Sequence, residues 1–139
     1  MDTTQLKPTI LYAEDDADDF ESVKEVLEQL SSDHTIVNAR NGAEAVNYLE
    51  SHRDHPPCLV ILDLNMPVMD GKEVLVWLKE KENLRELPVM VFTTSSREDD
   101  VRLCQKHSAT FFRKPTLYRD LLHIVQTMLQ MCETRSPQG

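Results

Sequence analysis

The sequence predicts an α/β protein in which one parallel five-stranded sheet, doubly wound by five helices, lies between two helical layers. Five short segments rich in β-branched and apolar residues alternate along the chain with five segments that have helical spacing. Some strand segments are apolar at every position, which is typical of strands covered on both faces. Right-handed crossovers between such strands give a parallel sheet with helices on both sides.

The candidate strands can be located directly. They are TILYA (9–13), TIVNA (35–39), CLVIL (58–62), PVMVFTT (88–94) and TFFR (110–113), the last being the weakest. β-Branched and apolar residues are frequent in all of them, as strands require.

The segments between the strands carry apolar residues on one helix face. These series are Phe20, Val23, Leu27 and Leu30; Val46 and Leu49; Val74, Leu75 and Leu78; Val101 and Cys104; and a long series from about Leu117 to Cys132. The acidic segment DDADD (15–19) is typical of a helix start, and so is SSRED (95–99).

Length and charge limit the possible functions. We expect one domain over residues 1–139, with a core at about 5–130 and a disordered tail at about 134–139. The 15 basic and 24 acidic residues give a net charge of −9, which would repel nucleic acids. The chain has neither a signal peptide nor a membrane-spanning apolar stretch, so we expect a soluble cytoplasmic protein without membrane contact.

The cysteines predict no disulfide framework. Cys58, Cys104 and Cys132 are odd in number, far apart and without a CxxC pair, which suits a reducing compartment and small apolar fillers. His52 and His55 precede Cys58, but two prolines turn the chain there, and we do not expect a zinc site.

Chemically active residues follow four of the five strand segments. Glu14 and Asp15 follow the first, Asp63 the third, Thr93 lies at the end of the fourth, and Lys114 follows the fifth. Because the carboxyl ends of parallel strands share one edge, these side chains should meet in the crevice where such sheets bind ligands.

The expected cluster suits a divalent cation and a phosphoryl group. Neighbouring carboxylates repel one another, and Mg²⁺ prefers carboxylate, carbonyl and water oxygens, so the backbone carbonyl of Asn65 is a further candidate ligand. Lys114 and the hydroxyl of Thr93 could each meet an anionic oxygen. A carboxylate between them, Asp63, is placed to act as the nucleophile in phosphoryl transfer.

This pattern resembles the receiver domain of two-component response regulators, in particular the single-domain type of chemotaxis and phytochrome signalling. The resemblance covers about residues 5–130, and its motifs are the pair Glu14 and Asp15, the block LDLNMPVMDG around Asp63, Thr93 in VFTTS, and Lys114 before Pro115. It implies a flavodoxin-like strand order 2-1-3-4-5.

The resemblance also implies a phosphorelay function. Mg²⁺ would bind Asp15, Asp63 and the carbonyl of Asn65, with Glu14 reaching it through water. By its likeness to regulators of phytochrome signalling, a sensor histidine kinase of phytochrome type would phosphorylate Asp63. The protein would then signal to a downstream target or a phosphotransfer protein, with only self-phosphorylation and self-dephosphorylation as its chemistry.

The signalling change is expected on the fourth helix, the fifth strand and the fifth helix. In the family the hydroxyl at the position of Thr93 moves toward the phosphoryl group and vacates space for an aromatic residue, here Phe111. Phe111 replaces the usual tyrosine and removes a hydroxyl from that face. Thr94 is larger than the residue usual at its position, which would narrow access of the phosphodonor or of hydrolytic water to the site.

Other functions use similar residues. Glu14 and Asp15 could merely stabilise the start of the first helix. An aspartate-dependent phosphatase would need a second acid at position 65, where this chain has Asn65. A flavodoxin-like flavin binder would need a Ser/Thr/Gly-rich loop where this chain has EDDADD (14–19). A non-phosphorylated protein-interaction module on the same fold is the remaining alternative.

The fifth helix has an unusually wide apolar face. Its two stripes are Leu117, Leu121, Ile124, Met128 and Met131, and Tyr118, Leu122, Val125, Leu129 and Cys132. Such a face either wraps the edge of the core or binds a second copy of the chain. We expect homodimers formed through the fourth and fifth helices.

Overall fold

Strands and helices alternate through the whole computed structural model, which describes residues 7–95 and 97–134. The strands are β1 (Thr9–Ala13), β2 (Thr35–Ala39), β3 (Leu59–Leu62), β4 (Val89–Thr93) and β5 (Thr110–Arg113). The helices are α1 (Ala17–Leu30), α2 (Gly42–Ser51), α3 (Gly71–Glu80), α4 (Glu98–Lys106) and α5 (Tyr118–Thr134). The predicted strands agree with these bounds to within one residue at each end.

The five strands form one parallel sheet in the order β2-β1-β3-β4-β5, as predicted. Every residue of β3 and β4 is buried, whereas β2 and β5 at the two edges are partly exposed. The strands β3 and β4, whose segments are the most continuously apolar, are therefore inner strands that are covered on both faces.

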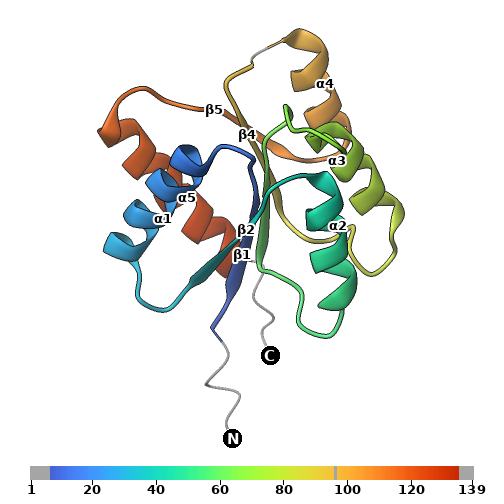
Figure 1. The fold of residues 1–139 in the computed structure, drawn as a ribbon, viewed down its shortest axis with the longest axis horizontal. Coiled ribbons are helices and arrows are strands. Elements are labelled where there is room, and N and C mark those ends of the chain that lie inside the picture. Colours follow the sequence, from blue (N-terminus) through green and yellow to red (C-terminus); the bar gives the residue numbers. More distant parts are fainter. Residues whose placement is uncertain (1–6, 96, 135–139) are drawn as a thin grey trace, which may run out of the picture.

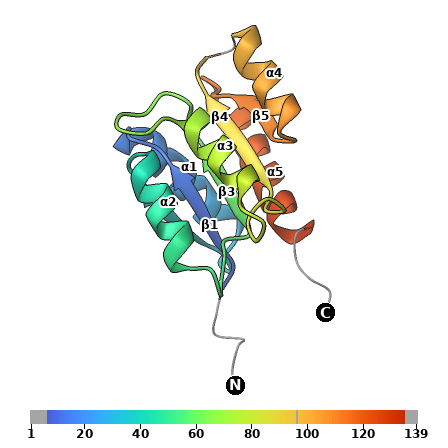
Figure 2. The same cartoon turned by 90° about the vertical axis from the view of Figure 1, so that its right-hand side faces the viewer.

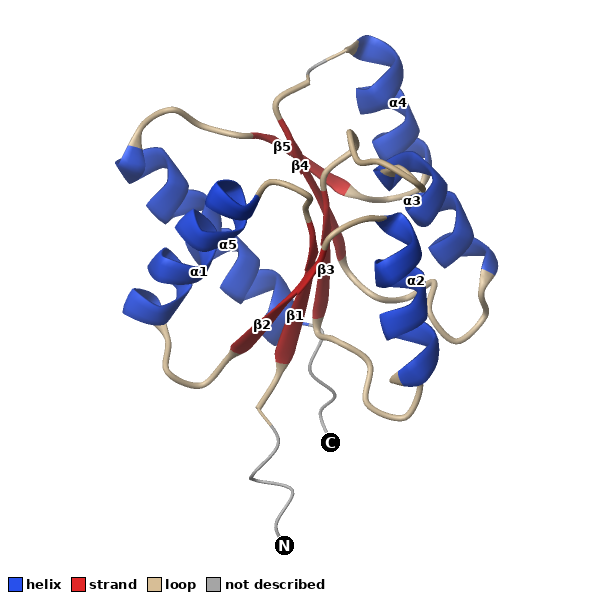
Figure 3. Ribbon diagram, viewed as in Figure 1, coloured by secondary structure: helices blue, strands red, loops and turns tan. Residues whose placement is uncertain are grey.

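Helices cover both faces of the sheet (Figures 1 and 3). The helices α1 and α5 lie on one face, where their apolar residues pack with Ile10 and Tyr12 of β1. The helices α2, α3 and α4 cover the opposite face, which receives Leu11 and Ala13 of the same strand. Figure 2 shows these three helices in front of the sheet. Successive residues of an inner strand thus enter two separate cores.

Helix starts follow the acidic signals in the sequence. Asp16 is the N-cap of α1, and its carboxylate accepts hydrogen bonds from the main-chain N–H groups of Asp18 and Asp19. Asp70 caps α3 in a reciprocal capping box with Glu73. These caps fix where each helix leaves the sheet edge that carries the predicted site residues.

Several details differ from expectation. In α2 the fully buried partner of Leu49 is Ala45 rather than Val46. The helix α5 includes Thr134, so the predicted tail at 134–139 begins inside a helix, and its residues 135–139 lie outside the described part of the chain. The same holds for the first residues of the predicted core, 5 and 6.

The prediction of three unpaired cysteines is wrong. Cys58 and Cys132 form a disulfide, whereas Cys104 is free and buried. The two partners are 74 residues apart in the sequence, and only the packing of α5 against the sheet brings them together. Local spacing carries no information about such a pair.

The wide apolar face of α5 is largely used by the core of its own chain. Ile124, Val125 and Met128 are buried, and Leu122 and Leu129 pack partly buried against the same cluster. Self-association through α4 and α5 remains a prediction. No helix in the described part of the chain is long and apolar enough to span a membrane.

The loop between β3 and α3 makes close main-chain contacts at two points, one with the start of α2 and one with the start of α3. The main-chain N–H of Gly42 donates to the carbonyl of Met69, and that of Gly71 to the carbonyl of Leu64. A Cβ atom at Gly42 would overlap the carbonyl oxygen of Met69, and one at Gly71 would overlap that of Asp63. Glycine is therefore required at both positions.

This loop contains a strained valine. Val68 has a φ of 69°, and the N–H of Met69 donates to the carbonyl of Pro67 at 2.7 Å, which makes a γ-turn centred on Val68. A β-branched residue rarely adopts a positive φ. Its side chain is 81 % exposed, so packing does not compensate for the strain.

We therefore expect Val68→Gly to raise the free energy of unfolding by about 1 kcal/mol, because relief of strain outweighs the added freedom of the unfolded chain. Val76→Gly is the matched control. Val76 lies within α3, where glycine should lower stability by about 1 kcal/mol or more. Urea unfolding of both variants measures the difference, and a loss of stability in Val68→Gly contradicts the inference of strain.

Candidate functional site

The predicted site residues lie where the carboxyl ends of four parallel strands share one edge. β1 and β3 are neighbours in the sheet although β2 separates them in the sequence. Chain connections diverge to either side of such a point, which leaves a crevice above it. Glu14 follows β1, Asp63 follows β3, and Thr93 and Lys114 complete the edge from β4 and β5.

Asp63 is the centre of the cluster. It is only 5 % exposed, and its Oδ1 accepts hydrogen bonds from the Thr93 hydroxyl and the main-chain N–H of Asn65, both at 3.0 Å. Its Oδ2 accepts from the Nζ of Lys114 at 2.8 Å. One charged and two neutral donors therefore surround a single carboxylate, the kind of environment that also stabilises an anionic group bound there.

Lys114 connects carboxylates from three parts of the chain. Its Nζ lies 2.6 Å from Glu14, 2.7 Å from Asp19 and 2.8 Å from Asp63. Burial alone would lower the pKa of Lys114, but the hydrogen bonds to Asp19, Asp63 and Glu14 raise it. The side chain therefore remains a cation. The main-chain N–H of Lys114 also donates to the carbonyl of Thr93 at 2.8 Å, which anchors its backbone to β4.

Glu14 is held in place by its own donors. The Tyr12 hydroxyl donates to Oε1 at 3.1 Å, and the N–H of Asp16 donates to Oε2 at 3.1 Å. The pKa of Glu14 is raised to about 7, mainly by burial; the hydrogen bond from Lys114 opposes the shift and the charge of Asp63 adds to it. This glutamate is thus more than a residue that stabilises the start of α1.

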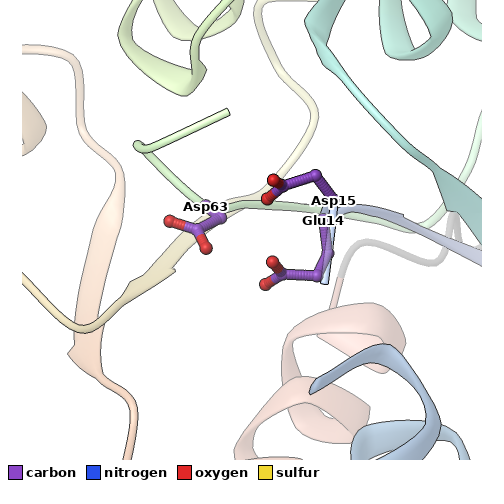
Figure 4. Close-up of side chains that lie close together, drawn as sticks. All are labelled: Glu14, Asp15 and Asp63. Carbon is purple, nitrogen blue, oxygen red and sulfur yellow. The ribbon is translucent and has the colours of Figure 1, made fainter. Parts of the chain in front are cut away.

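Asp15 completes an acidic triad. Oxygen atoms of Glu14, Asp15 and Asp63 all lie within 4.8 Å of one another. Figure 4 shows the side chains of Glu14 and Asp15 extending from adjacent positions toward Asp63. Asp15 is exposed, and among residues 7–95 and 97–134 no hydrogen bond or ion pair to its carboxylate is found.

The donor set fits a hard divalent cation. All three side chains offer carboxylate oxygens, and Lys114 neutralises only part of their charge. A cation that binds Asp15 and Asp63 would remove the remaining repulsion, and open access at Asp15 leaves room for water ligands. The exposed Asn65 lies beside Asp63, as the predicted carbonyl ligand requires.

Two further residues singled out from the sequence are the switch residue Phe111 and Thr94, which was expected to affect access to the site. Phe111 of β5 is partly buried and packs against the core under α2, α3 and α4. Thr94 directly follows Thr93 and is exposed. The other metal combination considered from the sequence, His52, His55 and Cys58, does not form a cluster in the described part of the chain.

Sequence reasoning missed two members of the cluster. Asp19 was assigned only to the start of α1, yet it forms an ion pair with Lys114. No local signal separates Asp19 from the other acids at this helix start, because all of them suit the first turn of a helix equally well. Tyr12, whose hydroxyl contacts Glu14, looked like an ordinary strand residue.

A further buried acid, Asp100, lies outside the cluster and was also missed. Its Oδ1 pairs with Lys72 of α3 at 2.9 Å, and its Oδ2 accepts from the Ser95 hydroxyl at 3.2 Å. The N–H of Ser95 in turn approaches the Thr93 hydroxyl at 3.4 Å. Asp100 therefore links the loop after β4 to both α3 and α4, while Thr93 connects that loop to Asp63.

Comparison with known proteins gives a consistent result. The family described as response regulator receiver domain matches residues 10–126 of this chain. The response regulator Rcp1 of Synechocystis sp. is 37 % identical over 122 residues, which cover 84 % of this chain and 83 % of Rcp1.

Solved structures show the same fold. The phosphorylated cyanobacterial phytochrome response regulator RcpA superposes with a TM-score of 0.84 at 29 % identity, covering 95 % of this chain and 98 % of RcpA. The Mn²⁺-bound form of Rcp1 gives a TM-score of 0.82 at 33 % identity, covering 95 % of this chain and 99 % of that one.

Of two substitutions at nearby acidic positions, only the one inside the acidic triad should weaken cation binding. Asp15→Asn should weaken binding of Mg²⁺ and Mn²⁺ at least about tenfold, because it removes an accessible carboxylate ligand. Asp18→Asn removes the same charge from an exposed position outside the triad and should leave affinity nearly unchanged. Titration calorimetry compares the two, and equal losses would mean that only the overall negative charge attracts the cation.

The buried contacts of Asp100 predict that its substitution destabilises the protein more than substitution of the adjacent Asp99. Asp100→Ala should lower the free energy of unfolding by about 1–3 kcal/mol, because it leaves Lys72 and the Ser95 hydroxyl without their buried acceptor. Asp99→Ala removes an exposed acid and should change stability by less than about 0.5 kcal/mol. Urea unfolding measures both, and similar values would show that the buried pair contributes little.

Proposed function

Because the chain belongs to the response regulator receiver domain family, we propose that it is a phosphorelay signalling protein in which Asp63 accepts a phosphoryl group. The observation that supports this most directly is the set of three donors on Asp63: the Lys114 ammonium, the Thr93 hydroxyl and the N–H of Asn65. This set lies beside an acidic triad suited to a divalent cation.

The chemistry assigns a role to each residue. A carboxylate oxygen of Asp63 attacks the phosphorus of a phosphohistidine, so that one P–O bond forms, the P–N bond breaks and the histidine leaves. The Lys114 ammonium neutralises negative charge on the equatorial oxygens of the phosphoryl group, and the Thr93 hydroxyl donates a hydrogen bond to one of them. Asp15, Asp63 and the carbonyl of Asn65 would hold Mg²⁺, with Glu14 acting through water. When bound, the cation supplies further neutralisation of the phosphoryl oxygens.

The same contacts offer a route for the signal. The Thr93 hydroxyl already contacts Asp63, so a phosphoryl group added there competes for this hydrogen bond. We assign the signalling change to Thr93 and Phe111, with α4, β5 and α5 as the face that changes. Thr94, exposed and directly after Thr93, would influence how fast water removes the phosphoryl group.

The proposed partners follow from the relatives. RcpA is described as a phytochrome response regulator, which supports a phytochrome-type sensor histidine kinase as the phosphoryl donor for this chain. The output would be a downstream protein or a phosphotransfer protein, reached in the cytoplasm. The net charge of −9 argues against a nucleic acid as the direct target.

A phosphatase acting on other substrates is a weaker candidate. Such enzymes use a nucleophilic aspartate with a second acid two residues later for proton transfer. Position 65 carries an asparagine, whose amide neither gives nor takes the required proton. We therefore assign the chain only self-phosphorylation and self-dephosphorylation chemistry.

Intact mass spectrometry tests the proposal. Incubation with Mg²⁺ and acetyl phosphate should add the mass of one phosphoryl group to the wild type and nothing to Asp63→Asn, because the amide is not a nucleophile. Asp54→Asn, at an exposed position between α2 and β3, should behave as the wild type. A wild type that gains no mass, or an Asp63→Asn variant that still does, contradicts the assignment of Asp63.

A further inference from the structure

We propose that Cys58 and Cys132 form a reversible disulfide through which thiol–disulfide exchange controls how firmly the end of α5 is held to the sheet. The inference goes beyond the phosphorelay function and does not depend on it. It concerns the end of the sheet opposite to Asp63, since Cys58 precedes β3 and Asp63 follows it.

The pair connects a fixed strand to a helix end. The N–H of Cys58 donates to the carbonyl of Thr9 at 2.9 Å, which attaches this residue to β1. Cys132 lies near the end of α5 and is only 3 % exposed. The two Cα atoms are 4.8 Å apart, within the range that a disulfide bridges without backbone movement.

The fold does not need the bond in order to dock α5. Ile124, Val125 and Met128 are buried in the core shared with α1 and the sheet. Hydrophobic packing therefore keeps the middle of the helix in place in the reduced protein. The disulfide adds a covalent connection only near the end of the helix, so that its formation changes local mobility rather than the fold.

The two cysteines differ in exposure, which favours exchange. Cys58 is partly exposed, whereas Cys132 is buried, so an external disulfide reaches Cys58 first. The thiolate of Cys58 attacks glutathione disulfide and releases one glutathione thiol. The thiolate of Cys132 then attacks the sulfur of Cys58 and releases the second. One protein dithiol and one glutathione disulfide thus give one protein disulfide and two thiols, and excess thiol reverses both steps.

The chain contains an internal control. Cys104 is buried and belongs to the core on the opposite face, under α2, α3 and α4. It should neither pair with Cys58 or Cys132 nor respond to the same treatment. Of three cysteines, two should change with redox state and one should not.

The consequence should appear in α5. This helix begins at Tyr118, shortly after Lys114 of the acidic cluster, and ends beside Cys132. Oxidation should slow amide hydrogen exchange in its last turns. Because the bond closes a long loop, with a sequence separation of 74 residues, it should also raise the melting temperature by roughly 10 °C.

Thiol counting tests the pairing without any substitution. Native wild-type protein is treated with glutathione disulfide or with excess dithiothreitol, then denatured and alkylated. We expect one label on the oxidised protein and three on the reduced protein, since the chain has three cysteines. Three labels in both samples would overturn the proposal, and so would one label that persists after dithiothreitol, because the bond would then not be reversible.

Matched variants test the consequence. The difference in melting temperature between oxidised and reduced samples should persist in Cys104→Ser and vanish in both Cys58→Ser and Cys132→Ser. A difference that survives in either of the latter two, or is absent from the wild type, contradicts the inference. Asp63→Asn should retain the full difference, so failure of the redox proposal and failure of the phosphorelay proposal are distinguishable.

Discussion

The ammonium group of Lys114 is the interaction on which the rest of the site depends. It contacts carboxylates of Glu14, Asp19 and Asp63, which belong to the loop after β1, to α1 and to the end of β3. Without a cation these buried or half-buried acids would repel one another and would have to protonate or move apart. With it they remain close together while the triad still carries excess negative charge. That excess is what makes the edge suitable for a second, divalent cation.

The parallel sheet explains how residues a hundred positions apart reach one another. Neighbouring strands lie about 4.8 Å apart, so side chains at the ends of β1, β3, β4 and β5 span only a few such spacings. The sheet order places β1 beside β3, with β4 and β5 following on the same side. Asp63, at the end of the fully buried β3, therefore occupies the middle of the row. Its central position allows donors from the loop after β3, from β4 and from the loop after β5 to converge on one carboxylate.

The sequence was sufficient for the strands and for the residues at their ends, because apolar runs and strand-end chemistry are local signals. It was insufficient where the partner depends on packing between distant elements. Nothing local distinguishes Asp19, which meets Lys114, from the neighbouring acids of α1. The burial of Asp100 follows from how α4 approaches α3, and helical spacing alone does not give that approach. The pairing of Cys58 with Cys132 similarly depends on where α5 ends on the sheet.

The positions of β3 and α5 connect the two ends of the molecule. β3 has the disulfide at its start and the phosphoryl-accepting candidate Asp63 just after its end. The helix α5 packs on one face of the sheet and runs from the segment after Lys114 to Cys132. Its 17 residues give it a length of about 25 Å. A rigid helix transmits a displacement at one end to the other unless that end is fixed. Under the proposed phosphorelay and redox functions, chemical change at Asp63 and at the cysteines would reach the same helix from opposite ends, without any contact between the two sites.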